Sequence, residues 1–434
     1  MKSFKILPSS SRRGRKFLRQ LCDRGDDLLD PKILKRSGRI VESVQQGGDR
    51  ALLEAVRRFD GSAARSLEEL RLSSAEADGD LPAGVEEALE RSIVAVERFH
   101  ERQVHPGYWL SENGVELVER RTPFSRVGIY VPGGRAAYPS TVVMTAVPAR
   151  LAGVGEIVVV TPPRSWESSS ALRYVLDRLG ITEVWGLGGA QAVAALAYGT
   201  ESIERVDKIV GPGNAWVTAA KYLVSGDVAI DGLAGPSEVV IVATGDADAE
   251  LVAADLLAQA EHDPRALALL VTDQKQLAKK VAGELSRQVK PLATAEVAKA
   301  ATCSALIVAD MTEALAVAEA LAPEHLQLIG AGAEALAEDV STASAIFVGP
   351  ASPVVFGDYI AGPSHVLPTG GTARFASALG VEDFVRRSHV VRFDATAARR
   401  TAAAAATLAE AEGLPAHAAS ARRRLDAEAL RRSQ

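Results

Sequence analysis

Apolar and polar positions change their spacing near residue 126 of this 434-residue chain. Upstream, residues 38–58 and 84–104 repeat apolar positions at helical spacing, with a break at Gly47-Gly48. Downstream, short apolar runs alternate with amphipathic segments. The runs predict strands at 126–131, 156–161, 183–187 and 208–210. Helices are expected between them, near 140–150, near 168–179, after Gly188-Gly189 and from Asn214.

A second alternating series begins at residue 238. It predicts strands at 238–242, 268–271, 305–308 and 343–348. Strands that alternate with helices indicate a parallel, doubly wound sheet. We therefore expect an α/β protein with two similar Rossmann-like units in succession, although no sequence repeat is visible. After about residue 380 the pattern becomes helical and alanine-rich, and such a segment suits docking on another domain or subunit better than a core of its own.

Composition narrows the class of function. The chain is 47% hydrophobic and 24% charged, as in globular proteins, and its net charge of −6 argues against nucleic acid or an acidic membrane surface as partner. The longest uncharged run, Val184–Thr200, contains four glycines and is not typical of a membrane span. The two cysteines, Cys22 and Cys303, form no disulfide or metal motif, which fits a reducing, cytoplasmic compartment. The basic N-terminus lacks a secretory apolar core, so we expect a surface arm.

The segment from Asp255 to Pro264 carries the first candidate chemistry. It is interpreted as a helix that ends at the proline, with Gln259 and His262 three residues apart on one face. An amide oxygen and an imidazole can both bind a divalent metal. On this segment alone, the favoured interpretation is a polar last turn, with His262 near the negative end of the helix dipole.

Three glycine-rich turns each close a predicted strand and open a helix: Val131-Pro-Gly-Gly-Arg135, Gly186-Leu-Gly-Gly-Ala-Gln191 and Gly211-Pro-Gly-Asn214. Anions and nucleotides bind at such turns, because free backbone N–H groups and the helix dipole point outward. Tight turns alone would account for each one. Three on one side of one predicted sheet favour a nucleotide-sized ligand.

Four of the seven histidines lie in segments punctuated by proline and glycine: His262, His325, His365 and His417. Glu324 precedes His325, and the pair could serve as acid and base, or could open a solvent-exposed helix after Pro323. Asp358 and His365 share an irregular loop, and such loops are often functional. Oxygen and imidazole donors without thiolate suit zinc or manganese. The other three histidines, His100, His105 and His389, are expected in solvent.

These motifs together resemble the histidinol dehydrogenase family, in order, from about residue 40 to about residue 419. The strings that carry the resemblance are Val127-Gly-Ile-Tyr-Val-Pro-Gly-Gly, Gly211-Pro-Gly-Asn, Ala234-Gly-Pro-Ser-Glu, Gln259-Ala-Glu-His-Asp, Pro323-Glu-His-Leu, Gly357-Asp-Tyr with Gly362-Pro-Ser-His-Val-Leu-Pro-Thr, and Glu412-Gly-Leu-Pro-Ala-His.

The resemblance implies oxidation of L-histidinol to L-histidine with two NAD molecules, through L-histidinaldehyde. It implies Glu324 and His325 as the acid/base pair and Gln259, His262, Asp358 and His417 as ligands of one Zn²⁺ per subunit, with Mn²⁺ as a possible substitute. Ser237, His365 and Glu412 then contact the substrate beside the ligands and His325. Tyr130, Gln191 and Asn214 are the implied NAD contacts. The implied assembly is a homodimer with exchanged terminal segments, in which Glu412 and His417 complete the partner's site.

With these roles the chain divides into four parts. They are an N-terminal arm (1–25), a discontinuous metal and substrate domain (26–129 and 239–380), an NAD-binding domain (130–238) and a helical C-terminal segment (381–434). Two rivals stay open: a dehydrogenase of the same scaffold for another polar alcohol, and a non-catalytic metal- or nucleotide-binding protein. The presence of the three implied substrate contacts, Ser237, His365 and Glu412, argues against a dehydrogenase for another alcohol. The presence of both Glu324 and His325 argues against a non-catalytic binding protein.

Overall fold

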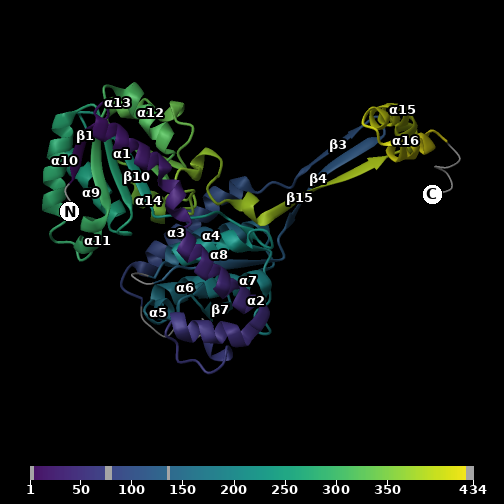
Figure 1. Ribbon diagram of the computed structural model, residues 1–434, viewed down its shortest axis with the longest axis horizontal. Coiled ribbons are helices and arrows are strands. Elements are labelled where there is room, and N and C mark those ends of the chain that lie inside the picture. Colours follow the sequence, from purple (N-terminus) through teal and green to yellow (C-terminus); the bar gives the residue numbers. More distant parts are fainter. Residues whose placement is uncertain (1–3, 74–80, 134–136, 427–434) are drawn as a thin grey trace. The chain divides into compact units, whose positions relative to one another are not determined.

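A computed structural model describes residues 4–73, 81–133 and 137–426. The chain divides into two compact units: unit 1 holds residues 1–103 and 124–384, and unit 2 holds residues 104–123 and 385–434 (Figure 1). The end of the first glycine turn, Gly134 and Arg135, lies outside the described residues. No helix in the described ranges combines the length and the apolar character needed to cross a membrane.

The first sheet of unit 1 has the order β2-β7-β6-β5-β8-β9. Its strands are β2 (Arg71–Leu72), β5 (Arg126–Tyr130), β6 (Glu156–Thr161), β7 (Glu183–Gly186), β8 (Lys208–Val210) and β9 (Ala229–Ile230). They run parallel except for β2 at one edge. Neighbouring residues of β6 enter opposite cores, with Val158 and Val160 on one side and Val159 on the other. Burial on both faces explains the continuous apolar runs in these strands.

Helices cover both faces of this sheet. On one side lie α2 (Pro31–Phe59), α7 (Gly189–Tyr198) and α8 (Ala215–Val224). On the other lie α3 (Val85–His100), α4 (Pro139–Ala152) and α6 (Ser170–Arg178), with the short α5 (Pro163–Glu167) nearby. The predicted break in α2 is present at Gly48, whose φ of 54° and ψ of −139° are not helical.

The second sheet is fully parallel, with the order β1-β12-β11-β10-β13-β14. Its strands are β1 (Lys5–Pro8), β10 (Glu238–Ala243), β11 (Leu267–Thr272), β12 (Thr302–Ile307), β13 (His325–Ile329) and β14 (Ala345–Val348). One face packs against α9 (Ala249–Ala260), α10 (Lys275–Gln288), α11 (Ala295–Ala300) and α14 (Val354–Tyr359). The other packs against α1 (Arg12–Cys22), α12 (Met311–Leu321) and α13 (Ala331–Glu334).

The central strands of the two sheets follow the same order, β7-β6-β5-β8 in the first and β12-β11-β10-β13 in the second. The expectation of two similar α/β units is therefore confirmed, although the sequence shows no repeat. The N-terminal segment expected as a surface arm contributes the edge strand β1 and the helix α1, whose Leu21 is buried.

The carboxyl edge of the second sheet is closed where β10 and β13 end. In doubly wound sheets a ligand binds at this edge, where the strand order reverses. Here Asp246 accepts the backbone N–H of Ala331 at 3.1 Å, at the start of α13. A Cβ at Gly330 would meet the Asp246 carboxylate as well. Asp246, an exposed residue, thus uses one of the N–H donors at the edge where other sheets of this topology bind a ligand.

Unit 2 joins a three-stranded antiparallel sheet, order β15-β4-β3, to two helices. Its elements are β3 (Tyr108–Glu112), β4 (Val115–Pro123), β15 (Val385–Phe393), α15 (Ala395–Ala411) and α16 (Pro415–Arg422). The prediction of a helical chain after about residue 380 is wrong for β15. This strand carries three arginines and is half-exposed or exposed along its length, so it lacks the apolar alternation that identifies a strand.

Candidate active site

Glu324 and His325 stand at the amino edge of the second sheet, where the chain leaves α12 and enters β13. Their side chains are only 7% and 5% exposed. The alternative of an exposed helix start after Pro323 is therefore wrong, because the five residues from His325 form a buried strand. The sequence hid this strand, since a glutamine, Gln327, interrupts its apolar run.

The Glu324 carboxyl is held by two donors. Its Oε2 accepts the hydroxyl of Ser237 and the backbone N–H of Glu238, both at 2.8 Å. Burial nevertheless raises the pKa of Glu324 to about 7, against the opposing effects of His325 and the two hydrogen bonds. A carboxyl that titrates near neutrality can both accept and return a proton at physiological pH.

The His325 ring is fixed in one tautomer by its neighbours. Its Nδ1 lies 2.9 Å from the backbone carbonyl oxygen of Glu238. A carbonyl oxygen only accepts, so Nδ1 carries the proton in the neutral ring and Nε2 has the free lone pair. Nε2 lies 3.8 Å from Oδ1 of Asp358. His325 is thus arranged as a base through Nε2.

A small pocket of about 10 Å³ collects the proposed metal ligands of unit 1. Gln259, His262 and Asp358 line it together with Asp255. Such a volume accommodates about one water-sized particle. The helix α9 ends at Ala260, earlier than expected, so His262 lies in the following turn rather than in the last helical turn. Both ligand candidates still reach the same pocket.

The donors of this pocket fit a zinc ion. They offer an amide, an imidazole and carboxylates without thiolate. Gln259 would bind the ion through its side-chain oxygen, because its Nε2 group is a hydrogen-bond donor and cannot coordinate a cation. Within the described ranges, no three His, Cys, Asp or Glu side chains are arranged to hold a metal ion by themselves.

His365 and Asp358 adjoin the same pocket. The structure places Asp358 in the short helix α14 and not in the irregular loop expected from sequence. The Nδ1 of His365 lies 2.9 Å from the backbone carbonyl oxygen of Asp358. Burial lowers the pKa of His365, partly offset by the Asp358 carboxylate. Ser237, Glu324, His325, Asp358 and His365 are therefore linked by contacts within unit 1.

Two of the proposed NAD contacts converge on the second glycine turn, at the carboxyl edge of the first sheet. The hydroxyl oxygen of Tyr130 accepts the N–H of Gly189 at 3.1 Å. Gln191 donates its side-chain amide to Asp60 at 3.0 Å, and Asp60 also accepts the N–H of Gly188. Burial raises the pKa of Asp60. These contacts hold the glycine turn in place and use the N–H groups of Gly188 and Gly189.

The third proposed NAD contact and the third glycine turn lie at the same edge. The side-chain oxygen of Asn214 caps α8 by accepting the N–H groups of Trp216 and Val217. Asn214 itself is exposed. The turn therefore presents a capped helix start toward solvent.

Glu412 and His417 belong to unit 2. Glu412 follows the last residue of α15, His417 lies in α16, and both are exposed. His417 lines a surface groove with Ala416, Ser420, Ala421 and Arg424. Unit 1 thus gathers three of the four proposed metal ligands, and the fourth stands on a separate unit.

One histidine expected in solvent is buried. His100 is 1% exposed, and its Nδ1 bonds to the side-chain oxygen of Gln103 at 2.7 Å. Burial lowers its pKa. His105 and His389 are exposed, as expected. Both cysteines are free thiols, and burial raises the pKa of Cys303 to about 12, so this thiol stays protonated and is no nucleophile at neutral pH.

Three residues of the site were missed from sequence. Asp255 lies one helical turn before Gln259, so its spacing could have revealed it. Glu238 follows Ser237 directly, and its backbone holds both Glu324 and His325. Asp60 gave no signal, because it reaches the glycine turn from 128 residues away.

Three features together are typical of an oxidoreductase. They are the nucleotide-type turns of the first sheet, the buried carboxyl and imidazole, and the pocket of metal donors. Comparison with known proteins then identifies the family. Residues 26–425 match the histidinol dehydrogenase family, to which the chain belongs.

Individual relatives agree with this assignment. The chain is 46% identical to histidinol dehydrogenase of Synechococcus sp. over 94% of its length and 95% of the relative's. It is also 46% identical to that of Caulobacter vibrioides, over 89% and 91%. The crystal structure of histidinol dehydrogenase from Elizabethkingia anophelis superimposes with a TM-score of 0.88 at 30% identity, covering 98% of both chains.

Proposed function

We propose that the protein oxidises L-histidinol to L-histidine through L-histidinaldehyde, the last steps of histidine biosynthesis, with NAD as acceptor and one Zn²⁺ per subunit. The observation that carries this proposal is the pairing of two different proton acceptors, Glu324 and His325, beside a pocket of metal donors. Two successive oxidations need two proton transfers of different kinds. A binding protein would need neither group.

His325 serves the first oxidation. The alcohol must lose its hydroxyl proton as a hydride leaves its carbon, and Nε2 of His325 is the free base atom at the site. The Asp358 carboxylate lies 3.8 Å from this atom and faces it. NAD, when bound, accepts the hydride in each oxidation.

Glu324 serves the second oxidation. The aldehyde must first become a hydrate, which requires a base to take a proton from water. Glu324 can do so because its pKa of about 7 leaves a large fraction ionised at neutral pH. The hydroxyl of Ser237 and the N–H of Glu238 hold the carboxylate in place while it acts. The hydrate then gives its carbon-bound hydrogen as a hydride to the second NAD and a hydroxyl proton to a base, and becomes the carboxylic acid.

The ligand roles follow the pocket. Gln259, His262 and Asp358 would hold the zinc ion together with His417, and Mn²⁺ could replace it. When bound, the ion supplies positive charge that orients the substrate. Ser237, His365 and Glu412 would contact the substrate, and Tyr130, Gln191 and Asn214 would support NAD. The NAD-binding part would span residues 130–238, and the metal and substrate part residues 26–129 with 239–380.

The stoichiometry of the cofactor tests the reaction. Purified protein with histidinol and excess NAD is expected to form about two NADH per histidine, because each oxidation releases one hydride. NADH absorbance and amino-acid analysis of the same sample give the ratio. A ratio near one would contradict the two-step reaction, and no NADH at all would contradict the activity.

We further propose that two subunits share their sites. Within the described part of unit 2, the buried apolar residues are Ala397, Ala402, Ala406 and Ala418. Large apolar side chains of the unit, by contrast, are exposed: Tyr108, Trp109, Leu110, Val391, Phe393, Leu408 and Leu414. A unit with so small a core needs another protein surface to cover it. A second copy of the chain, whose site would receive Glu412 and His417, meets that need.

Complementation between two inactive variants tests the sharing. His262→Asn damages a ligand of unit 1, and His417→Asn damages one of unit 2. If a site takes its unit 1 ligands from one chain and His417 from the other, a dimer of one chain of each variant has one site with both substitutions. Its other site has neither. Random reassociation of equal amounts should then restore about a quarter of the wild-type activity. Activity that stays at the level of the separate variants would show that each site is built from one chain.

A further inference from the structure

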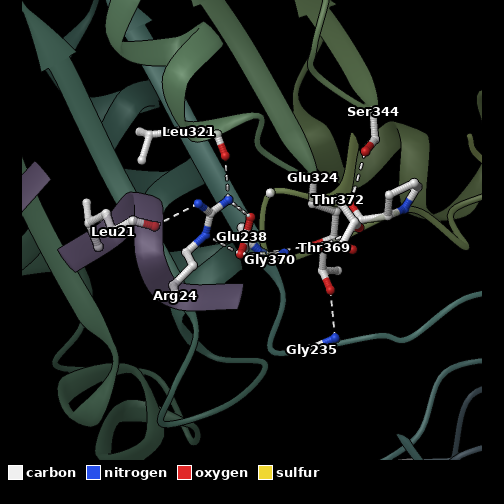
Figure 2. A network of polar contacts seen from close by, with 12 residues as sticks. Leu21, Arg24, Gly235, Glu238, Leu321, Glu324, Ser344, Thr369, Gly370 and Thr372 are labelled. Atoms are coloured by element: carbon white, nitrogen blue, oxygen red, sulfur yellow. Dashed lines mark hydrogen bonds and ion pairs between the residues drawn. The ribbon is translucent and has the colours of Figure 1, made fainter. Parts of the chain in front are cut away.

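A buried ion pair joins the N-terminal segment to the first residue of β10 (Figure 2). Arg24, in the short 3₁₀-helix Asp23–Leu28, donates from Nε to Oε1 and from Nη2 to Oε2 of Glu238, both at 2.6 Å. The side chains are 14% and 4% exposed. Two parallel hydrogen bonds between a planar guanidinium and a carboxylate fix both position and orientation.

The main chain of Glu238 holds both proposed bases. Its N–H donates to Oε2 of Glu324 at 2.8 Å, and its carbonyl oxygen accepts Nδ1–H of His325 at 2.9 Å. Any shift of this one peptide segment therefore moves the carboxylate of Glu324 and the ring of His325 together.

Arg24 also anchors the turn that leads to Glu324. Its Nη2 donates to the carbonyl oxygen of Leu321, the last residue of α12, at 2.8 Å. The next residue, Ala322, has a φ of 42°, a left-handed conformation that residues other than glycine seldom adopt. Such a turn persists only where its surroundings determine it. Arg24 supplies one of these constraints two residues before Pro323-Glu324 begin the site.

A third segment completes the clamp. The N–H of Gly370 donates to Oε1 of Glu238 at 3.0 Å, and the N–H of Gly235 donates to the hydroxyl of Thr369 at 2.6 Å. Figure 2 shows Glu238 between Arg24 on one side and the Thr369–Gly370 segment on the other. The Glu238 carboxylate is therefore held from two directions.

We infer that Arg24 and Glu238 are positioning residues that hold Glu324 and His325 in their reactive geometry. A buried ion pair gains little stability over an apolar pair of similar size, because both charges lose their hydration. Its contribution here is orientation, since it fixes the one residue whose backbone contacts both bases. The inference deepens the proposed oxidation of histidinol and rests on it.

The variants Arg24→Gln and Glu238→Gln test this inference in the full-length, zinc-loaded protein. We expect kcat to fall by about 10-fold to 100-fold with the KM values for histidinol and NAD nearly unchanged, because misplaced catalytic groups act on the transition state. Arg24→Lys should recover part of the loss. The double variant should be no slower than the slower single variant, because the two residues act as one unit.

Arg126→Gln is the matched control. Arg126 is also buried and pairs with two carboxylates, Glu156 and Glu183, at the amino edge of the first sheet. Thermal unfolding and zinc content are measured for every variant. The control should lose stability while kcat stays within about 2-fold of wild type.

Equal kcat values for Arg24→Gln and Arg126→Gln would overturn the inference and leave the proposed reaction standing. So would a loss of kcat that Arg24→Lys does not relieve, or one that follows the loss of zinc or of folded protein. A wild-type protein that forms no NADH from histidinol would instead overturn the proposed function, and the inference with it.

Discussion

Replacement of Glu324 by glutamine is expected to slow the oxidation of histidinaldehyde by about 10²-fold to 10⁴-fold, the usual contribution of a general base. Glutamine keeps an oxygen that can accept from Ser237 and Glu238, but it cannot take a proton from water. The oxidation of histidinol should slow much less, because the proposed mechanism assigns that proton to His325. Single-turnover NADH formation from each substrate measures the two steps separately.

A carboxylate on the surface provides the control for this experiment. Glu296→Gln alters a carboxylate that is 89% exposed, and it should leave both steps unchanged. Equal slowing of the two steps by Glu324→Gln would contradict the role given to this residue.

Glu324 should also make the rate of aldehyde oxidation depend on pH. Burial raises the pKa of Glu324 to about 7, and only its ionised form acts as a base. Aldehyde oxidation by the wild-type protein should therefore increase from about pH 6 to about pH 8 and then level off. The Glu324→Gln variant should lose this rise.

Replacement of His262 by asparagine is expected to weaken zinc binding by more than about 100-fold, because even residues that only orient a metal ligand contribute 10-fold to 100-fold. His262 is the imidazole of the pocket and Asp358 is one of its two carboxylates, and the loss of either leaves too few strong donors. Competition with a chromophoric chelator measures the affinity without reference to activity.

His389→Asn is the control for this experiment. His389 is an exposed histidine of β15 in unit 2, and its removal should leave the zinc affinity unchanged. Wild-type affinity in His262→Asn would show that the pocket lined by Gln259 and Asp358 is not the zinc site.

The sequence indicated the first sheet closely, because strands buried on both faces are continuous apolar runs. The predicted strand at 156–161 coincides with β6, and the other three end within one residue of β5, β7 and β8. The apolar pattern did not predict a strand where a polar side chain is buried or where the whole strand is exposed. Gln327 is fully buried within β13, and the exposed β15 has no apolar face. Neither strand can be recognised from alternation alone.

The site could be predicted from the sequence only in part, for a similar reason. The motifs around Glu324, Asp358 and Gln259 were visible in sequence, and their roles followed from a family resemblance. The partners that hold them were not visible. Arg24 reaches Glu238 across 214 residues, and an ordinary arginine near the N-terminus carries no sign of that contact. Long-range contacts of this kind depend on tertiary packing and not on local pattern.

The contact of Asp246 with the backbone N–H of Ala331, at the carboxyl edge of the second sheet, bears on the course of the proposed reaction. Its carboxylate takes the Ala331 N–H at the edge where a dinucleotide would bind, and its charge disfavours a phosphate there. The glycine turns assigned to NAD in the proposed reaction follow strands of the first sheet. In that reaction both NAD molecules would therefore bind at the first sheet, one after the other. Reduced cofactor departs and fresh cofactor arrives while the half-oxidised substrate stays bound, so the turnover cycle includes an exchange step between its two chemical steps.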